Sequence, residues 1–249
     1  MLQSRELLRQ PEQPALPRSD ACDVFIKVGG SILDQEVATA ALVSSVTALS
    51  GDFRVVILTG GGQAVKRIKA NQRTFGTPFY ACWRAGVLCL DVTAHLLASY
   101  ATRFTVASSL TDISACLGAG NIAVFAPAGT ILNSLELTPD WEVTTDSMGL
   151  YFASLLGARR YVVVSDVDGV YDRRPQEHAG AAPIARLGVE ELEQLPTSKL
   201  DHSFPAYFRR YALPTVVVNG KYPQRVSAAI RGERTVGTEI DVSSVATRI

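Results

Sequence analysis

The sequence has no block rich in Lys and Arg, and its 24 basic and 24 acidic residues give a formal net charge of zero. A broad positive surface for nucleic acid is therefore not expected, and any bound anion should be small and held locally. The four cysteines lack Cys-x-x-Cys spacing and are too sparse for a secreted disulfide scaffold, so we interpret them as free thiols. No apolar stretch approaches the roughly 20 residues that cross a bilayer, and the start of the chain does not have the pattern of a signal peptide. These absences favour a cytoplasmic protein without a membrane partner.

Three nucleotide-binding or metal-binding signatures are also missing. The sequence contains no Gly-x-x-x-x-Gly-Lys-Ser/Thr string, which excludes a P-loop nucleotidase. A dinucleotide-dependent dehydrogenase needs Gly-x-Gly-x-x-Gly and an acidic residue about 20 positions later, and the glycine run at 60–62 lacks that spacing. An EF-hand needs an oxygen ligand where Val170 stands and a Glu near the loop end, so the acidic turn at 166–172 does not indicate a calcium site.

Short apolar runs alternate with segments of helical spacing along the chain. This alternation predicts an α/β fold, a three-layer αβα sandwich with a mainly parallel central sheet. The predicted strands are 24–28, 55–58, 104–107, 122–125, 161–164 and 215–218, and the predicted helices are 37–49, 87–100, 147–156, 203–211 and 225–230. At 249 residues and 47% hydrophobic content, the chain can bury a substantial core.

We expect one domain preceded by an extension. Residues 1–20 have three prolines and no continuous apolar run, which indicates a flexible N-terminal extension. Residues 21–249 would form a single domain. A change of sequence character near 127–139 divides this domain into an acceptor lobe of about 21–140 and a nucleotide lobe of about 141–249.

Two glycine-rich turns directly follow apolar runs. Lys27 precedes the first turn, and a glycine triplet forms the second. Glycine has no Cβ, so backbone N–H groups can close on phosphate oxygens while the Lys27 ammonium supplies a full positive charge. Glycine pairs also close ordinary strand-to-helix turns, but two such turns at neighbouring strand ends indicate a polyphosphate channel. The residues expected to bind phosphate here are Gly29, Gly30, Ser31, Gly60, Gly61 and Gly62.

Thr144, Thr145 and Asp146 precede a helical pattern and should lie at or near a helix N-terminus. That position favours phosphate oxygens. It is also typical of a helix cap, because Thr, Asp and Ser side chains satisfy the free N–H groups of a helix start. Both interpretations stay open from this segment alone.

Five motifs, taken in chain order, resemble the amino acid kinase superfamily over about residues 23–240. They are the two glycine turns, the Thr-Thr-Asp-Ser segment, the acidic turn and the run Val218-Asn219-Gly220. The resemblance implies in-line transfer of the γ-phosphoryl group of ATP, with Mg²⁺ carried by the nucleotide rather than by a metal site of the protein. It also implies a homo-oligomer, either a dimer or a hexamer.

The resemblance implies a role for each motif. Lys27 would neutralise charge on the transferring group, and Asp146 would orient Lys27 or a Mg-bound water, so these two are the expected catalytic residues. The glycine amides, with Thr144 and Thr145, would hold phosphate oxygens. The adenosine pocket would be lined by Asp166, Val167, Tyr171 and Asp172, although Tyr171 could equally belong to the core.

One feature of the superfamily is missing. Its carboxylate kinases carry a second lysine in a Gly-Met-x-x-Lys segment, where this chain has Leu-Asp-His-Ser-Phe at 200–204. Uridylate kinase also has an acidic residue there, so the departure favours a small-molecule phosphate acceptor over a carboxylate. An ionised acceptor phosphate needs no general base, which leaves His202 a structural or positioning role. Lys221, Lys199, Arg67 or the metal remain candidates for the second positive charge.

The segments 141–150, 200–205 and 216–226 are most similar to superfamily members that phosphorylate (5-(aminomethyl)furan-3-yl)methyl phosphate in methanofuran synthesis. The resemblance therefore implies that acceptor and a diphosphate product. An isopentenyl phosphate or uridylate-type kinase is the alternative, and a non-catalytic ATP- and oxyanion-binding protein similar to molybdenum storage protein is a second one. The side chains expected to contact the acceptor are Arg67, Trp83, Asp91, Trp141 and Asp201.

Overall fold

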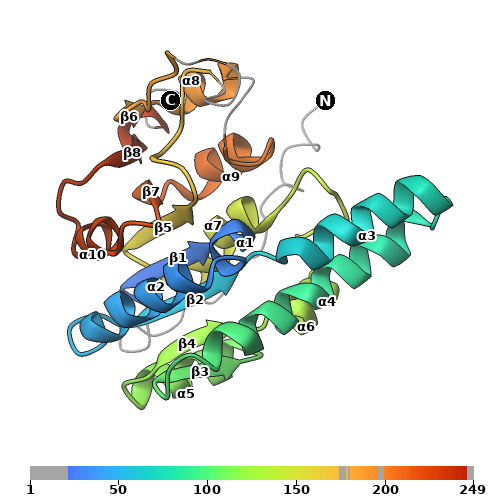
Figure 1. Cartoon of the computed structure of the whole chain (residues 1–249), viewed down its shortest axis with the longest axis horizontal. Helices are drawn as coiled ribbons and strands as arrows, with labels where there is room; N and C mark the ends of the chain where they lie inside the picture. The colour runs from blue at the N-terminus through green and yellow to red at the C-terminus, as the bar shows by residue number, and fades with distance from the viewer. Residues whose placement is uncertain (1–21, 174–177, 179, 196–198, 246–249) are drawn as a thin grey trace, which may run out of the picture.

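The computed structural model describes residues 22–173, 178, 180–195 and 199–245. The expected N-terminal extension at 1–20 lies outside these residues. Within them, a central sheet runs through the molecule and helices cover both of its faces (Figure 1). The predicted three-layer αβα architecture is confirmed.

The sheet contains eight strands within the described residues, in the order β3-β4-β2-β1-β5-β7-β8-β6. All pairings are parallel except that of β7 with β8. β1 lies between β2 and β5, so the carboxyl ends of these three strands open on one edge of the sheet. The strands are β1 (Val24–Val28), β2 (Val55–Thr59), β3 (Phe104–Ala107), β4 (Ile122–Phe125), β5 (Arg160–Ser165), β6 (Arg186–Leu187), β7 (Thr215–Asn219) and β8 (Gly237–Ile240).

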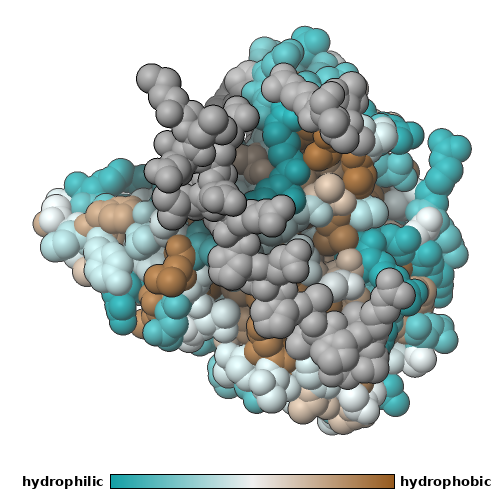
Figure 2. All heavy atoms as spheres, turned by 180° about the vertical axis from the view of Figure 1, so that it is seen from behind, coloured by the Kyte–Doolittle hydropathy of each residue, from teal (hydrophilic) through white to brown (hydrophobic). Residues whose placement is uncertain are grey.

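Helices connect the parallel strands. The longest described helix, α4, packs beside α3, and the two form an arm that projects from the rest of the molecule (Figures 1 and 2). The helices are α1 (Gly30–Leu33), α2 (Glu36–Leu49), α3 (Gly62–Phe75), α4 (Phe79–Ala98), α5 (Leu110–Gly118), α6 (Ala128–Leu132), α7 (Thr145–Leu155), α8 (Val189–Gln194), α9 (Phe204–Tyr211) and α10 (Pro223–Arg231), followed by a 3₁₀ helix (Val242–Val245).

Buried side chains form one core on each face of the sheet. Successive strand residues point to opposite faces, so Phe25 belongs to one core and Ile26 to the other. The first core packs against α5, α7, α8 and α9, and the second against α2 and α10. Because both faces are covered, the strands are apolar throughout rather than alternating, as the sequence predicted.

α4 corrects the expectation that no apolar stretch approaches the length of a membrane span. By length and composition, this 20-residue helix could cross a bilayer, with a mean hydropathy of 1.3 over 18 residues. Such a helix is weak support for a membrane span, because the core helix of a globular domain has the same composition. Here Trp83, Val87, Leu90 and Leu97 are buried against the rest of the domain.

Candidate active site

Three glycine turns lie at the carboxyl edge of the sheet and are joined to neighbouring strand ends by backbone hydrogen bonds. Gly29 N donates to Val164 O at 2.9 Å, and Gly60 N donates to Val28 O at 2.8 Å. Gly220 N, after β7, donates to the β5 carbonyl of Ser165 at 2.8 Å. The turns after β1, β2 and β7 are therefore fixed relative to one another by the sheet.

Gly30 and Gly62 bring the first two turns into close contact. A Cβ at Gly30 would lie 2.5 Å from Cα of Gly62 and 2.6 Å from its nitrogen. Gly62 has φ of +55°, a left-handed conformation that side chains disfavour. Both glycines are needed for this approach, which places the starts of α1 and α3 side by side.

Lys27 and Asp146 form an ion pair beside these turns. The Lys27 Nζ lies 2.6 Å from Asp146 Oδ1, and their side chains are only 12% and 9% exposed. No hydrogen-bond donor of the described residues is aligned on this oxygen, so the contact is electrostatic rather than directional. The Tyr161 hydroxyl donates to the Asp146 carbonyl at 2.9 Å, and burial, together with the charges of Asp146 and Asp201, raises the pKa of Tyr161. The phenol therefore remains a neutral donor that fixes the backbone at Asp146.

The start of α7 carries Asp146 and is capped twice. Thr144 is its N-cap, and its hydroxyl accepts a hydrogen bond from Asp146 N. The Asp201 carboxylate accepts hydrogen bonds from Thr144 N at 2.9 Å and Thr144 Oγ1 at 2.7 Å, and from both N and Oγ of Ser147. Burial and the nearby charge of Asp146 raise the pKa of Asp201, and these hydrogen bonds oppose that rise. Thr144 therefore acts as a cap in this structure, while Thr145 is the first residue of α7.

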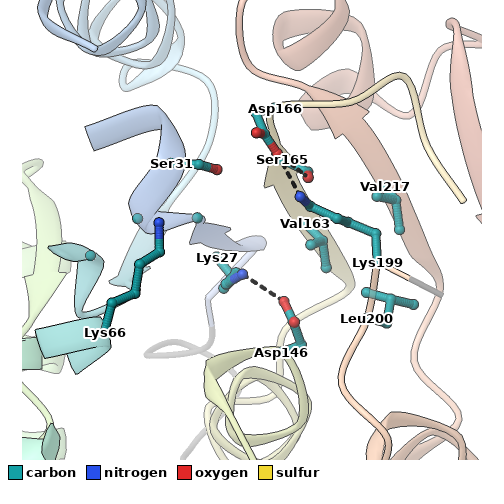
Figure 3. A pocket seen from close by; sticks show the side chains of 13 residues that line it. Lys27, Ser31, Lys66, Asp146, Val163, Ser165, Asp166, Lys199, Leu200 and Val217 are labelled. Atoms are coloured by element: carbon teal, nitrogen blue, oxygen red, sulfur yellow. Dashed lines mark hydrogen bonds and ion pairs between the residues drawn. The ribbon is translucent and has the colours of Figure 1, made fainter. Parts of the chain in front are cut away.

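A cavity of about 310 Å³ opens beside the ion pair (Figure 3). Lys66 extends into it from α3, on the opposite side of Lys27 from Lys199, which precedes α9. Three lysine side chains and two carboxylates thus share one small space, and the lysines supply the positive charge by which proteins hold phosphate groups. The lining residues are Lys27, Gly29, Gly30, Ser31, Gly62, Lys66, Asp146, Val163, Ser165, Asp166, Lys199, Leu200 and Val217.

The sequence did not single out Lys66, although a signal was present. α3 begins at Gly62, so Lys66 is one turn later on the same helix face. Its side chain leans back toward the helix start and therefore toward the glycine turn. Arg67, the neighbouring residue that the sequence favoured, is exposed and does not line the cavity.

Asp166 and Asp168 follow β5 and serve different purposes. Asp166 lines the cavity and lies 2.9 Å from the Lys199 ammonium; that contact lowers the pKa of Asp166 against the raising effect of burial. Asp168 accepts hydrogen bonds from Asn219 at 2.8 Å and Arg225 at 2.6 Å, and these bonds tie the acidic turn to the end of β7. The motif residues Asp168 and Asn219 therefore hold the two turns together.

Three of the expected adenosine contacts lie outside the cavity lining. Val167 is half-buried directly after Asp166. Tyr171 forms a bridge with Pro183, and the Asp172 carboxylate accepts a hydrogen bond from Ala182 N at 3.0 Å. Their adenosine role stays a prediction.

The five expected acceptor contacts are not brought together around one cavity. Besides Arg67, described above, Trp83 is a core residue at 3% exposure, and Asp91 accepts a hydrogen bond from Ala128 N at 2.8 Å. The Trp141 indole donates to Gln72 at 2.7 Å, and Lys69 lies 4.6 Å from its ring centroid. Asp201 is engaged at the start of α7. Acceptor roles for these residues stay predictions.

The cavity combines glycine turns, lysines and a helix start at the carboxyl edge of a parallel sheet, which is typical of phosphate-binding α/β proteins. The profile of the amino acid kinase family matches residues 24–219. The chain therefore belongs to the amino acid kinase family and is a kinase of that family.

Several known proteins are similar to the chain over most of its length. The [5-(aminomethyl)furan-3-yl]methyl phosphate kinase of Methanocaldococcus jannaschii is 24% identical over 87% of this chain and 96% of its own. A uridylate kinase of Methanoculleus marisnigri is 27% identical over 87% and 94%, and a molybdenum storage protein subunit of Azotobacter vinelandii is 26% identical over 88% and 85%. The crystal structure of uridylate kinase from Archaeoglobus fulgidus superimposes with a TM-score of 0.73 at 22% identity, covering 88% of this chain and all of that one.

Proposed function

We propose that the protein transfers the γ-phosphoryl group of ATP to a small phosphate monoester. The observation that carries the proposal is the cavity in which the Lys27–Asp146 pair meets the glycine turns, Lys66 and Lys199. Such a cavity supplies positive charge and backbone donors on several sides, as phosphoryl transfer between two anions requires.

In the proposed reaction an oxygen of the acceptor phosphate attacks Pγ as the bond from Pγ to the β,γ-bridging oxygen breaks. ADP leaves with that electron pair. Lys27 neutralises charge on the transferring group, and Asp146 holds the Lys27 ammonium in place. The amides of Gly30 and Gly62 hold phosphate oxygens around it, while the Gly29 amide stays bonded to Val164 O.

Mg²⁺ fits this site as a companion of the nucleotide. Mg²⁺ keeps several waters and is bound mainly through substrate phosphates and one or two carboxylates. Asp146 and Asp166 are the carboxylates that line the cavity. When bound, the ion would neutralise part of the phosphate charge.

The acceptor is proposed to be a phosphate because the described lining residues offer three cations, and their two carboxylates, Asp146 and Asp166, are paired with Lys27 and Lys199 rather than free to act as a base. His202 is exposed and does not line the cavity with Lys27. A hydroxyl acceptor would need a group to take its proton, whereas a phosphate monoester is already ionised near neutral pH. Lys66 enters from the acceptor-lobe side and is the side chain that we assign to the acceptor phosphate.

Among phosphate acceptors we propose (5-(aminomethyl)furan-3-yl)methyl phosphate, which would give the diphosphate. The similarity to a kinase of that name supports this choice. Uridylate is the runner-up, because uridylate kinases are similar over a comparable length. Isopentenyl phosphate belongs to the same chemical class of acceptor.

The test incubates the protein with Mg-ATP and, separately, the aminomethylfuran phosphate, UMP, isopentenyl phosphate and acetylglutamate, with products identified by mass. Diphosphate from the first acceptor alone is the expected result. Lys27→Met is the matched inactive control, and its turnover should fall by about 10²-fold or more. ATP binding with no acceptor phosphorylated would contradict the proposal and favour the non-catalytic alternative.

We further propose that the protein is a cytoplasmic homo-oligomer that assembles through α4. Leu88, Val92 and Leu96 are 52%, 56% and 62% exposed and recur every four residues, so they form one apolar helix face. A second copy of the same face would bury these side chains around a twofold axis. The choice between dimer and hexamer is left to measurement of the assembly's mass.

A further inference from the structure

Lys199 is a cavity residue that the reaction described above does not use. It lies just before α9, and its ammonium is 2.9 Å from Oδ1 of Asp166, at the end of β5. Figure 3 shows its side chain extending along the wall of the cavity, beside Val163 and Ser165, with its ammonium at Asp166. Lys27 and Lys199 therefore present two ammonium groups to one space from different elements of the fold.

We propose that Lys199 is a catalytic residue that contacts the γ-phosphate of ATP and supplies the second positive charge, with Asp166 as its positioning partner. The inference rests on the proposed function and names the cation that the sequence left open. In the reaction, Lys199 would share with Lys27 the charge of the phosphoryl group as its bond to the bridging oxygen breaks and its bond to the acceptor oxygen forms. No proton is transferred to or from Lys199.

The Lys199–Asp166 ion pair is exposed enough for the Lys199 ammonium to leave Asp166 and bind the γ-phosphate instead. The side chains are 44% and 27% exposed, and an ion pair with that exposure contributes little to the stability of a protein. A γ-phosphate carries more negative charge than a carboxylate and accepts several hydrogen bonds, so it can take the ammonium from Asp166 at little cost. Asp166 meanwhile keeps the flexible lysine side chain inside the cavity.

The other candidate cations are placed less well for this role. Lys221 is exposed in the turn after β7 and does not line the cavity. Arg67 is exposed on α3 and is also absent from the lining. Lys66 does line the cavity but enters from α3, across Lys27 from the nucleotide lobe, which suits the acceptor phosphate (Figure 3).

The test compares Lys199→Met with Lys221→Met, a change at an exposed lysine of the same lobe outside the cavity. Lys199→Met should lower kcat by about 10²-fold, the usual effect of losing one preorganised donor to the transferring group. The KM for the acceptor should change by less than about threefold, because Lys199 is not assigned to it. Lys199→Arg, which keeps the charge, should recover part of the loss, and Lys221→Met should match the wild type.

Nucleotide affinity gives a readout that does not depend on the acceptor. Calorimetry should show that Lys199→Met weakens Mg-ATP binding by about tenfold while changing ADP binding little, since ADP has no γ-phosphate. If the wild type binds ATP but phosphorylates no acceptor, the proposed function fails, yet this ATP-to-ADP ratio still decides the role of Lys199. The inference would be overturned if Lys199→Met had the same kcat and the same ratio of Mg-ATP affinity to ADP affinity as Lys221→Met.

Asp166→Asn separates the catalytic role from a structural one. If the ion pair only stabilised the fold, Asp166→Asn and Lys199→Met would lower turnover and the melting temperature equally. We expect Lys199→Met to lose more turnover, because Asp166→Asn leaves the cation in place. Circular dichroism and melting curves check folding, and Lys199→Gln serves as a second neutral variant if Lys199→Met does not fold.

Discussion

Ser147 and Asp201 are joined by two hydrogen bonds, although 54 residues separate them in the sequence. The Ser147 backbone N donates to Asp201 Oδ2 at 3.1 Å, and the Ser147 hydroxyl donates to Oδ1. One residue before Ser147 is Asp146, the partner of Lys27. The position of the ion pair therefore depends on a carboxylate that lies just ahead of α9.

Asp201→Asn is expected to destabilise the start of α7. The amide has one acceptor oxygen where the carboxylate has two, so at least one donor of Thr144 or Ser147 loses its partner. The free energy of unfolding should fall by about 1–3 kcal/mol, and turnover should fall with it because Asp146 is held less firmly. Urea unfolding and steady-state kinetics measure the two effects. Asp52→Asn, at an exposed carboxylate, is the control, and equal behaviour of the two variants would refute the capping role.

Gly30→Ala tests the contact between the two glycine turns. Its new Cβ would lie 2.5 Å from the backbone of Gly62, so the turns must separate. We expect a loss of about 1–3 kcal/mol of stability from this overpacking and weaker binding of ATP. Gly51→Ala is the matched control, because nothing lies within 4 Å of its Cβ and its φ is not left-handed. Calorimetric titration and thermal melting should show a large effect at Gly30 and almost none at Gly51.

Charges placed on the exposed face of α4 should disrupt assembly. Leu88→Glu combined with Leu96→Glu would bury two carboxylates if that face is an interface, which is strongly unfavourable. The wild type is expected to sediment as a dimer or larger, and the double variant as a monomer with an unchanged circular dichroism spectrum. Val37→Glu, at a residue of α2 that is 84% exposed, should not alter sedimentation. A monomeric wild type would rule out the proposed interface.

Cys22 should make stability fall at alkaline pH. Burial, together with the charge of Asp23, raises the pKa of this fully buried thiol from its ordinary value of 9.0 to about 12. An unfolded chain loses the thiol proton near pH 9, while the folded chain keeps it. The contribution of Cys22 to the free energy of unfolding is therefore complete below pH 9 and is lost between pH 9 and 12. The slope is about 1.4 kcal/mol per pH unit.

The measurement compares urea unfolding of the wild type and Cys22→Ala between pH 8 and pH 10.5. Lysines and tyrosines titrate in both proteins, so the difference between the two free energies isolates Cys22. That difference should shrink as the pH rises. A constant difference would show that Cys22 does not contribute to the pH dependence.

The long parallel strands could be predicted from the sequence because burial on both faces makes them continuously apolar. β1, β3 and β4 have the predicted bounds, and β2, β5 and β7 extend the prediction by one or two residues. β8 could not be predicted because Gly237 and Glu239 interrupt its apolar pattern, and β6 has two residues. The antiparallel pairing of β8 with β7 depends on tertiary packing rather than on local sequence.

The parts of the site that could be predicted are those where the backbone restricts the residue type, such as glycine turns and helix starts. Glycines at strand ends predicted turns that lie at the carboxyl edge of the sheet, and Thr144 and Asp146 were placed at a helix start, as found. Side chains that reach the cavity from other elements were harder to find. Lys66 and Lys199 are ordinary lysines locally, and only the docking of α3 and of the segment before α9 brings them to Lys27.

The central place of β1 has a consequence for how the chain is made. One edge of β1 pairs with β2, which follows it closely, but Val24 on the other edge pairs with Arg160. That second edge stays unpaired during synthesis until β5 has emerged from the ribosome, and exposed apolar edges of this kind favour aggregation. Because parallel pairing across so many residues is intrinsically slow, the half-made chain is the species that most needs protection by chaperones.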